Sequence, residues 1–313
     1  MKSIGAAKST SASSSLGSVA GRALTGRRRH RGPRALATAI VWISVAYFLL
    51  PLVWLLFAST KANQDLFTTF GFGFGTSNEF VNNIMHTLDF NNGIYVRWLA
   101  NSFGYAIAGA LGAAASAALA GYALAMYHFP GKRAVSTLVI GAIMVPSAAL
   151  AIPTYLVFAK AGLVNTPLAV ILPSMVSPFA VFLMREYSKA AIDKELLEAA
   201  RMDGAGEFRI FRQICLPLLA PGVATVLLFT FVAAFNNYFL PLLMLNNGDL
   251  LPVTVGLSRW YGLGGSNAVG AYSVSFFPMV MAGSVMATLP LIVAFLFLQR
   301  YWQSGLATGA IKG

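Results

Sequence analysis

The chain has 313 residues, of which 57% are hydrophobic and only 10% are charged, and its formal net charge at pH 7 is +12. Soluble domains contain about a quarter charged residues, so this composition excludes an ordinary soluble protein and indicates a polytopic membrane protein. The single cysteine, Cys215, excludes an internal disulfide. The sequence has no Gly-rich loop of the GxxxxGK type and no residues at metal-ligand spacing, which predicts no metal site and no ATPase of that kind.

Residues 1–36 are rich in Ser, Ala, Gly and Arg, and they include eight basic residues but no acidic one. Such a segment cannot bury enough apolar surface to fold, so we expect a disordered basic tail. The arginines between Arg27 and Arg34 could contact nucleic acid, but beside a membrane span they are expected to contact anionic lipid. A cleaved signal peptide is disfavoured, because the apolar run that follows is too long for one.

Six apolar stretches are long enough to cross about 30 Å of hydrocarbon. The predicted spans cover approximately residues 38–58, 99–126, 135–159, 168–184, 218–240 and 276–298. We therefore predict an all-α fold, with a six-helix transmembrane domain over residues 37–298 and a short tail over residues 299–313. Residues 60–97 are mixed in character and are interpreted as a loop.

Two features of the spans predict how their helices pack. Gly109, Gly112 and Gly121 in the second span leave room for neighbouring helices to approach closely, where lipid provides no hydrophobic drive. Pro146 and Pro153 in the third span each remove a backbone hydrogen bond and are expected to kink it. Kinks could open a central cavity, or they could simply reflect how common prolines are in membrane helices.

Basic residues are distributed unevenly between the two sides of the predicted topology. The side that holds both termini carries 18 Lys and Arg residues, and the other side carries four. The positive-inside rule then places both termini and the loop of residues 185–217 in the cytoplasm, in a multi-pass protein of the cell membrane. The positive net charge is therefore interpreted as a signal of topology, and no nucleic-acid partner is predicted.

The predicted spans contain no Asp, Glu, Lys, Arg or His. Carriers driven by protons or sodium usually keep such groups at membrane depth, so an ion-coupled secondary transporter is the weaker alternative, although backbone carbonyls can bind sodium. An integral membrane enzyme is also disfavoured, because no His, Asp and Glu cluster occurs at a membrane face. The energy for any transport is then expected to come from a partner.

A long polar stretch, residues 188–217, interrupts the hydrophobic sequence between the fourth and fifth spans. Its spacing predicts two short amphipathic helices, with Gly204 and Gly206 breaking the chain between them. The apolar stripe of the first helix is predicted at Ile192, Leu196, Ala199 and Ala200. That of the second helix is predicted at Phe208, Phe211 and Ile214. A hairpin of this kind offers a surface that another protein can bind. The alternative is an amphipathic helix that lies among lipid headgroups.

The same stretch resembles the EAA signature of permease subunits in ABC importers. The signature residues, all at the family spacing, are Glu198, Ala199, Ala200, Gly204, Ile214, Leu216 and Pro217. The resemblance implies that residues 188–217 form the coupling helices, which dock into a groove on a cytoplasmic ATPase. It makes Glu198, Ala199, Ala200 and Gly204 the core of that contact, with Arg201 and Asp203 as flanking polar contacts and with Ile214, Leu216 and Pro217 completing the docking set.

The resemblance extends over about residues 37–313, and the ending, residues 299–313, is similar to that of the second permease subunit of maltose-type importers. It implies a type I importer bundle that moves a sugar or oligosaccharide by alternating access. The implied partners are a different permease, two ATPase copies and an extracytoplasmic solute-binding protein, which would face the loop of residues 241–275. The tail would reach the ATPase interface. ATP would be bound by the partners, so this chain would hold no cofactor and would not be an enzyme.

The densest polar group in a predicted span is Asn236, Asn237 and Tyr238, near the outer end of the fifth span. These side chains could hydrogen-bond a polar solute, with Phe235 or Tyr238 stacking on a sugar face. The alternative is hydrogen bonding between helices, which contributes roughly 0.6–2 kcal/mol per bond. We therefore treat the three residues as a candidate substrate path.

Overall fold

A computed structural model of the chain describes the backbone of residues 31–265 and 275–309 and the side chains of residues 36–265 and 275–297. The chain divides into two compact units, residues 1–51 and residues 52–313, and each is described by itself. Most of the predicted disordered tail, residues 1–30, lies outside the described residues. The helix α1 (Arg31–Ser59) begins within that predicted tail. Pro33 lies in its first turn, where a missing N–H has no intrahelical partner to lose.

In the first unit, the described residues belong to α1. Its apolar stretch Leu36–Ser59 is a candidate membrane span with a mean hydropathy of 2.4. The side chains from Leu36 to Pro51 are all exposed. A helix that is apolar on every side suits a lipid environment, so the first predicted span is confirmed.

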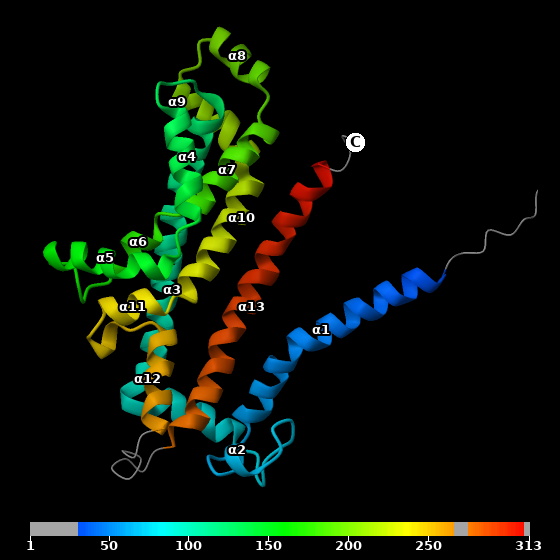
Figure 1. Cartoon of the computed structure of the whole chain (residues 1–313), viewed down its shortest axis with the longest axis vertical. Helices are drawn as coiled ribbons and strands as arrows, with labels where there is room; N and C mark the ends of the chain where they lie inside the picture. Colours follow the sequence, from blue (N-terminus) through cyan, green and yellow to red (C-terminus); the bar gives the residue numbers. More distant parts are fainter. Residues whose placement is uncertain (1–30, 266–274, 310–313) are drawn as a thin grey trace, which may run out of the picture. The chain divides into compact units, whose positions relative to one another are not determined.

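All the regular secondary structure in the described part of the second unit is helical (Figure 1). Its elements in chain order are α2 (Asp65–Thr68), α3 (Phe80–Met126), α4 (Lys132–Ile143), α5 (Ser147–Lys160), α6 (Leu168–Ser174), α7 (Pro178–Ala191), α8 (Lys194–Met202), α9 (Glu207–Ile210), the π-helical turn η1 (Phe211–Cys215), α10 (Leu216–Phe235), α11 (Phe239–Met244), the 3-10 turn η2 (Gly248–Leu250), α12 (Val253–Gly265) and α13 (Phe276–Gly309).

Five stretches in the described residues are long and apolar enough to span a membrane, and a bent helix pair makes a sixth. The bent pair is α4 and α5, which meet at 107°. The third predicted span, residues 135–159, is therefore sharply bent within its bounds, at one of the two prolines that predicted a kink there. The break falls at Pro146, which is extended (φ −60°, ψ 127°) and disfavours helical geometry at Val145 before it.

The other span boundaries also shift. The helix α3 starts at Phe80, inside the segment interpreted as a loop, and breaks between Phe90 and Gly93 before continuing. Asn91, Asn92 and Gly93 have φ values of 49°, 57° and 73°, a left-handed conformation that Asn and Gly tolerate better than other residues. The fourth span is divided into α6 and α7, the fifth ends at Phe235, and α13 continues past residue 298 to Gly309.

The helix α3 lies at the centre of the second unit, packed against α7, α10 and α13. Its glycines contact the α6–α7 segment. A Cβ on Gly109 would lie 2.7 Å from Ser174 Cβ, one on Gly112 2.9 Å from Met175 Cβ, and one on Gly121 2.6 Å from Met184 Cβ. Real Cβ atoms do not approach so closely, so these contacts confirm the predicted close packing through small residues.

We expect Gly121→Ala to destabilise the second unit, because the added methyl would also lie 2.7 Å from the Arg185 backbone nitrogen, which cannot move alone. Overpacking of this kind costs about 1–3 kcal/mol. Gly104→Ala is the matched control, since it lies on the same helix with nothing within 4 Å of the new atom. Thermal unfolding of the purified protein in detergent should show a lower midpoint for Gly121→Ala alone; equal midpoints would contradict the packing.

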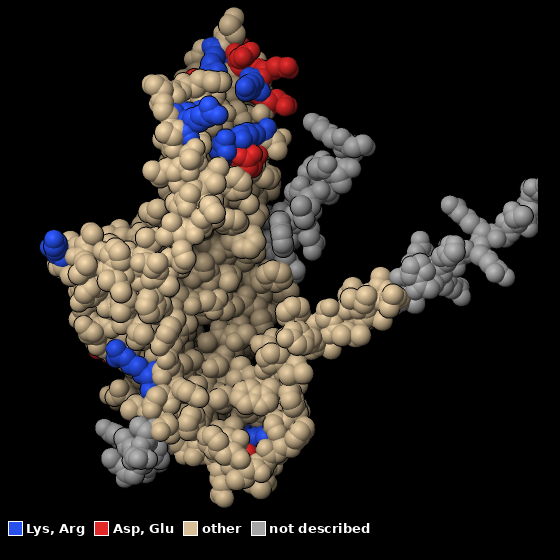
Figure 2. Space-filling model, viewed as in Figure 1, with Lys and Arg blue, Asp and Glu red and all other residues tan. Residues whose placement is uncertain are grey.

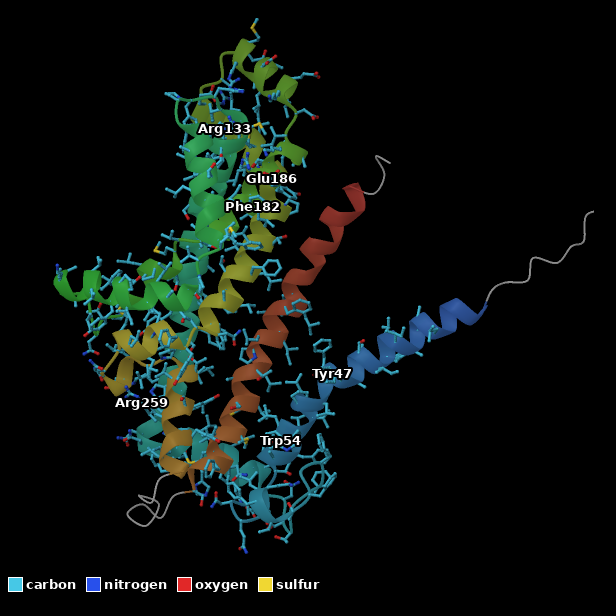
Figure 3. The ribbon with its side chains drawn as sticks, in the orientation of Figure 1. Tyr47, Trp54, Arg133, Phe182, Glu186 and Arg259 are labelled. Atoms are coloured by element: carbon cyan, nitrogen blue, oxygen red, sulfur yellow. The ribbon has the colours of Figure 1, made fainter. Side chains whose placement is uncertain are left out.

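Two buried clusters lie at opposite ends of this unit. One contains Tyr95, Trp98 and Trp260. The other, called the α8-end cluster below, contains Ala117, Tyr122, Met184, Ile192, Leu197, Ile210, Cys215 and Leu219. On the face shown in Figure 2, charged side chains gather over α8, α9 and the adjoining ends of α4 and α7. Figure 3 shows Arg133 and Glu186 toward this end and Arg259 toward the other.

The segment between the last two predicted spans is folded against α3. The Trp98 indole donates to the Gly248 carbonyl at 2.8 Å, Tyr105 donates to the Leu250 carbonyl at 2.9 Å, and the Val253 N–H donates to Ser102 Oγ at 2.8 Å. The described part of the predicted loop 241–275 therefore packs closely through η2 and α12. Its residues 266–274 lie outside the described residues.

Candidate functional site

Residues 188–217, called the polar hairpin below, form the end of the second unit farthest from α12, with α8 at the tip (Figure 1). The helix α8 has Glu195 in its first turn and Arg201 in its last, which places each charge favourably for the helix dipole. It is followed by Gly204, whose φ of 78° is one that L side chains rarely adopt. No atom lies within 4 Å of a Cβ added there, so the backbone, and not the available space, requires glycine.

Backbone hydrogen bonds fix the end of α8. The Ala205 N–H donates to the Ala200 carbonyl and the Gly204 N–H donates to the Arg201 carbonyl, both at 3.0 Å. This pair of bonds is a Schellman motif, which satisfies carbonyls that the helix end would otherwise leave free. The predicted break at Gly204 is confirmed, and the turn has a defined geometry.

The inward face of α8 differs from the predicted stripe. Ile192, Leu197 and Ala200 are buried in or against the α8-end cluster, whereas Leu196 is 42% exposed and Ala199 is exposed. The predicted phase was wrong because Ile192 precedes the helix, in an extended conformation, so it does not share the helical register that begins at Lys194. Ala200 is 8% exposed, because it lies on the face of α8 that packs against the α8-end cluster and not on the outer face of the helix.

Two large apolar side chains on the hairpin are far more exposed than its other large apolar side chains. Met202 is 87% exposed and lies on the same face of α8 as the exposed Leu196 and Ala199, which precede it at three-residue spacing, and Phe208 on α9 is 75% exposed. Phe208 was predicted in the second apolar stripe, but the buried positions of that segment are Ile210 and Cys215. Met202 was missed, although its spacing of three from Ala199 could have indicated it. We call Leu196, Ala199, Met202 and Phe208 the apolar tip.

The other predicted docking residues fall in two places. Glu198, Arg201, Asp203 and Gly204 are exposed around the apolar tip. Ile214 is half-buried against the α8-end cluster, while Leu216 and Pro217 are exposed at the start of α10. The turn η1 precedes them, and its π-type bond runs from the Leu216 N–H to the Phe211 carbonyl. Pro217 has no N–H to donate, which fits this irregular ladder.

Glu207 links three elements and was not singled out from the sequence. It accepts hydrogen bonds from Arg201 Nε at 2.7 Å and from the Tyr127 hydroxyl at 2.5 Å. These bonds connect the end of α8, the start of α9 and the residue after α3. Burial, and then the hydrogen bond to Glu207, raise the pKa of the Tyr127 phenol. No local pattern predicts this contact, because Tyr127 and Glu207 are 80 residues apart.

Aromatic contacts continue the same connection into the bundle. The Tyr122 ring lies 5.1 Å from Phe211 and 5.6 Å from Tyr127, measured between centroids. Gly222 on α10 packs directly on Tyr187 of α7, since a Cβ there would lie 2.7 Å from the ring. The hairpin is therefore attached to α3, and α10 to α7, by short contacts.

The predicted substrate-path residues lie at the break between α10 and α11. Asn236 Nδ2 donates to the Val232 carbonyl of its own helix at 3.0 Å. The Asn237 carbonyl accepts from Thr254 Oγ1 at 2.9 Å, and the Tyr238 hydroxyl lies 3.1 Å from Ser258 Oγ. Two of the three residues thus contact α12, which is the kind of interhelical bonding left open as the alternative.

Residues 117–307 match the family described as the binding-protein-dependent transport system inner membrane component. The match runs from α3 through the polar hairpin into α13. The chain belongs to this family. The permease fold and the resemblance inferred from the signature residues are thereby confirmed, as is a multi-pass protein of the cell membrane.

Several named proteins are similar to this permease. The arabinooligosaccharides transport system permease protein of Bacillus subtilis (strain 168) is 32% identical over 280 residues, which cover 89% of this chain and 95% of that protein. The lactose transport system permease protein of Rhizobium radiobacter is 30% identical over 284 residues, covering 91% and 98%. These relatives are transport permeases and not enzymes, and they do not favour an ion-coupled carrier.

A solved structure shares the fold. It is a bacterial ABC transporter involved in the import of the acidic polysaccharide alginate, matched with a TM-score of 0.75 at 22% identity. The match covers 88% of this permease and 98% of the other chain. At this identity the likeness shows the fold alone, and it confirms the all-α importer bundle predicted from the sequence.

Proposed function

We propose that the permease imports a sugar or oligosaccharide, using energy from ATP that partner subunits hydrolyse. Support comes from relatives named for arabinooligosaccharides, for lactose, and for melibiose, raffinose and stachyose. A relative named for sn-glycerol-3-phosphate is also similar, at 31% identity over 210 residues. The identity of the transported solute is therefore the first property to determine. The permease would pair with a different permease, two ATPase subunits and an extracytoplasmic binding protein, and would bind no cofactor itself.

The observation that carries this proposal is the apolar tip, exposed at the end of a hairpin that bears the complete signature. Large apolar side chains with little contact to their own chain mark a docking surface. Met202 is flexible and polarisable, so it can fit a preformed groove, and the small side chain of Ala199 allows a partner to approach the helix closely. The exposed Glu198, Arg201 and Asp203 would form the polar rim of the contact.

The contacts behind the tip suggest how motion reaches the membrane. A displacement of α8 would act on α3 through Arg201, Glu207 and Tyr127, and on η1 through the aromatic contacts of Tyr122. Packed elements of this kind move as rigid bodies, so the spans would rock between outward-facing and inward-facing arrangements. Glu207 would then hold α8 in place relative to α3.

The proposed orientation puts the hairpin and both termini in the cytoplasm. The uneven distribution of Lys and Arg supports it, and so does their concentration around α8 and α9 (Figure 2). The end of α13 beyond residue 298 would extend the last helix toward the ATPase subunits.

The complete importer, reconstituted in vesicles with its binding protein, tests the function. We expect uptake of the binding protein's ligand to require ATP and to persist when proton and sodium gradients are collapsed. In the same preparation, Ala199→Cys should form a cross-link to the ATPase subunit. Uptake that follows an ion gradient without ATP, or labelling of that cysteine from outside intact cells, would overturn the proposal.

We propose that Asn237 contributes to the solute path. Its side chain is half-buried at the α10–α11 break. The Thr254 hydroxyl contacts only the backbone carbonyl of Asn237, not its side-chain amide. Asn237→Leu should lower uptake about tenfold, since a lost hydrogen bond to a solute costs about 1.5 kcal/mol. Asn236→Leu is the comparison, because that side chain bonds its own helix. Unchanged uptake with Leu at position 237 would assign the residue to packing.

A further inference from the structure

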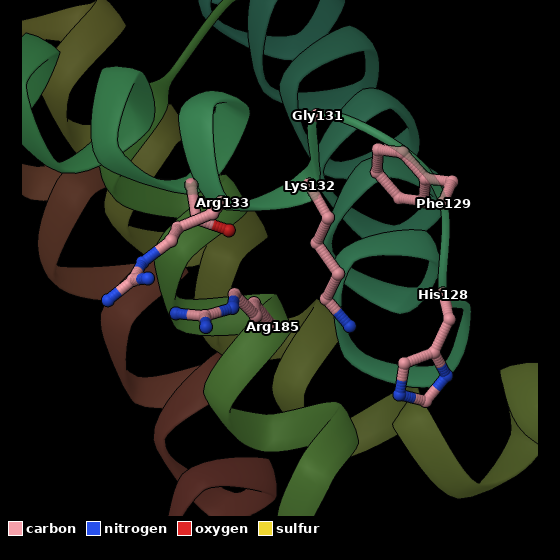
Figure 4. A pocket seen from close by; sticks show the side chains of 7 residues that line it. His128, Phe129, Gly131, Lys132, Arg133 and Arg185 are labelled. Atoms are coloured by element: carbon pink, nitrogen blue, oxygen red, sulfur yellow. The ribbon is translucent and has the colours of Figure 1, made fainter.

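A basic cavity lies at the α8 end of the second unit, between the start of α4 and α7 (Figure 4). Its volume is about 510 Å³. Lys132 and Arg133 extend into it from α4 and Arg185 from α7, and His128, Phe129 and Ser136 complete its wall. The lining contains no acidic residue. None of these residues belongs to the signature that identified the hairpin.

The positive charge of the cavity is only partly compensated. Arg185 Nη1 bonds Glu186 Oε1 at 2.9 Å, but the same oxygen accepts from Lys189 at 2.8 Å, so one carboxylate serves two cations. Lys132 Nζ donates to the uncharged Tyr127 carbonyl at 2.8 Å and is repelled by Arg185, Lys189 and Lys194. Among the described residues, Arg133 has no ion pair and the buried Arg185 Nε has no hydrogen-bond partner.

The helix α4 adds to this positive field. It is 12 residues long and begins at Lys132, with no acidic residue in its first turn. The N-terminal end of a helix carries partial positive charge that an acidic side chain usually offsets. Here two basic residues occupy that turn, so an anion held in the cavity would relieve repulsion from the side chains and from the helix end together.

An exposed apolar surface continues from the cavity along α4. Ile140 and Ile143 follow the lining residue Ser136 at spacings of four and seven, so they lie on the same face of the helix; both are exposed, and Phe129 is exposed at the rim. A phospholipid combines the two features that meet here, a phosphate for the basic residues and acyl chains for the apolar side chains. Basic pockets between membrane helices near the cytoplasmic surface recognise such headgroups. Free phosphate would satisfy the charge but would leave the apolar surface uncovered.

We propose that this cavity binds the phosphate of an anionic phospholipid, with Arg133 and Arg185 holding the phosphate and the acyl chains lying along α4. The site is separate from the apolar tip, and its occupancy would place a lipid beside Tyr127, the residue that contacts Glu207 of the hairpin. The permease would thereby sense the lipid composition on the side of the membrane where its hairpin lies.

Native mass spectrometry of the intact importer complex, titrated in detergent with phosphatidylglycerol or phosphatidylcholine, tests this proposal. We expect phosphatidylglycerol to bind more tightly, and Arg133→Gln with Arg185→Gln to weaken it about 25-fold, because each basic residue near an anionic headgroup contributes roughly a factor of five. Arg133→Gln alone should weaken it about fivefold, and it keeps the test valid if the double variant does not assemble. Arg259→Gln, an exposed arginine toward the other end of the unit, is the matched control (Figure 3).

The outcomes separate the possible occupants. Weaker phosphatidylglycerol binding in the cavity variants, with normal binding in Arg259→Gln, supports the proposal. Equal lipid affinity in all variants overturns it. Inorganic phosphate that protects the complex in a way dependent on Arg133, without any preference among lipids, would assign the cavity to a soluble anion and overturn the lipid site. Loss of the ATPase subunit with unchanged lipid binding would assign it to a protein contact.

Discussion

Gly204→Val is expected to separate the permease from its ATPase while leaving it inserted in the membrane. Gly204 has a φ of 78°, where a side chain costs roughly 1–2 kcal/mol and a β-branched one more. The Schellman bonds at the end of α8 depend on this conformation, so valine would leave only a small fraction of molecules with the native turn. The apparent affinity for the ATPase is reduced in proportion to the fraction of molecules that keep the native turn, which predicts a loss of about 10-fold to 30-fold.

Gly206→Val is the matched control for this prediction. Gly206 lies two residues further on and is exposed, with nothing within 4 Å of an added Cβ. Its φ of −72° and ψ of 154° are an extended conformation that valine adopts readily. A pull-down of the ATPase with detergent-solubilised permease compares the two variants at equal membrane yield. If both retain the ATPase equally, the turn geometry is not what docking requires.

The signature shows why part of the site could be predicted from the sequence. Gly204 was identified because a helix that ends with a residue at positive φ usually has a glycine there, and this glycine directly follows the amphipathic segment in the sequence. The close packing of Gly109, Gly112 and Gly121 was predictable for a similar reason, since small residues on one helix have few other uses in lipid. Local geometry that demands one residue type is visible without a structure.

Other features depend on contacts between distant segments, or on where a helix begins, and neither can be inferred from the local sequence. Pro146 predicted a kink in the third span, but the size of the bend between α4 and α5, 107°, could not be predicted, because apolar residues continue across the proline. The single apolar stripe predicted for α8 combines buried Ile192 and Ala200 with exposed Leu196 and Ala199, because the helical register begins only at Lys194 and cannot be extended back to Ile192. The Tyr127–Glu207 hydrogen bond depends on two segments meeting in space, and the basic cavity depends on α4 and α7 doing so.

Replacing the two most exposed large side chains of the apolar tip should have the strongest effect on assembly. Met202→Asp with Phe208→Asp is expected to weaken ATPase binding more than about 100-fold, because central apolar anchors of an interface often contribute 2 kcal/mol or more each and a buried carboxylate adds a desolvation cost. At 87% and 75% exposure, these residues contribute little to the packing of the permease itself. Thermal unfolding of the isolated variant should therefore match that of the unaltered chain.

Arg209→Gln distinguishes an apolar contact from a charged one. Arg209 is exposed on α9, next to Phe208, and bonds only Gln213 among the described residues, at 3.0 Å. If the tip docks through apolar burial, removing this charge should change ATPase affinity by less than about threefold, as is usual for surface charges. If Arg209→Gln weakens binding as much as the double substitution does, or if the double variant still couples ATP hydrolysis to uptake, then the apolar tip is not the surface that the ATPase grips.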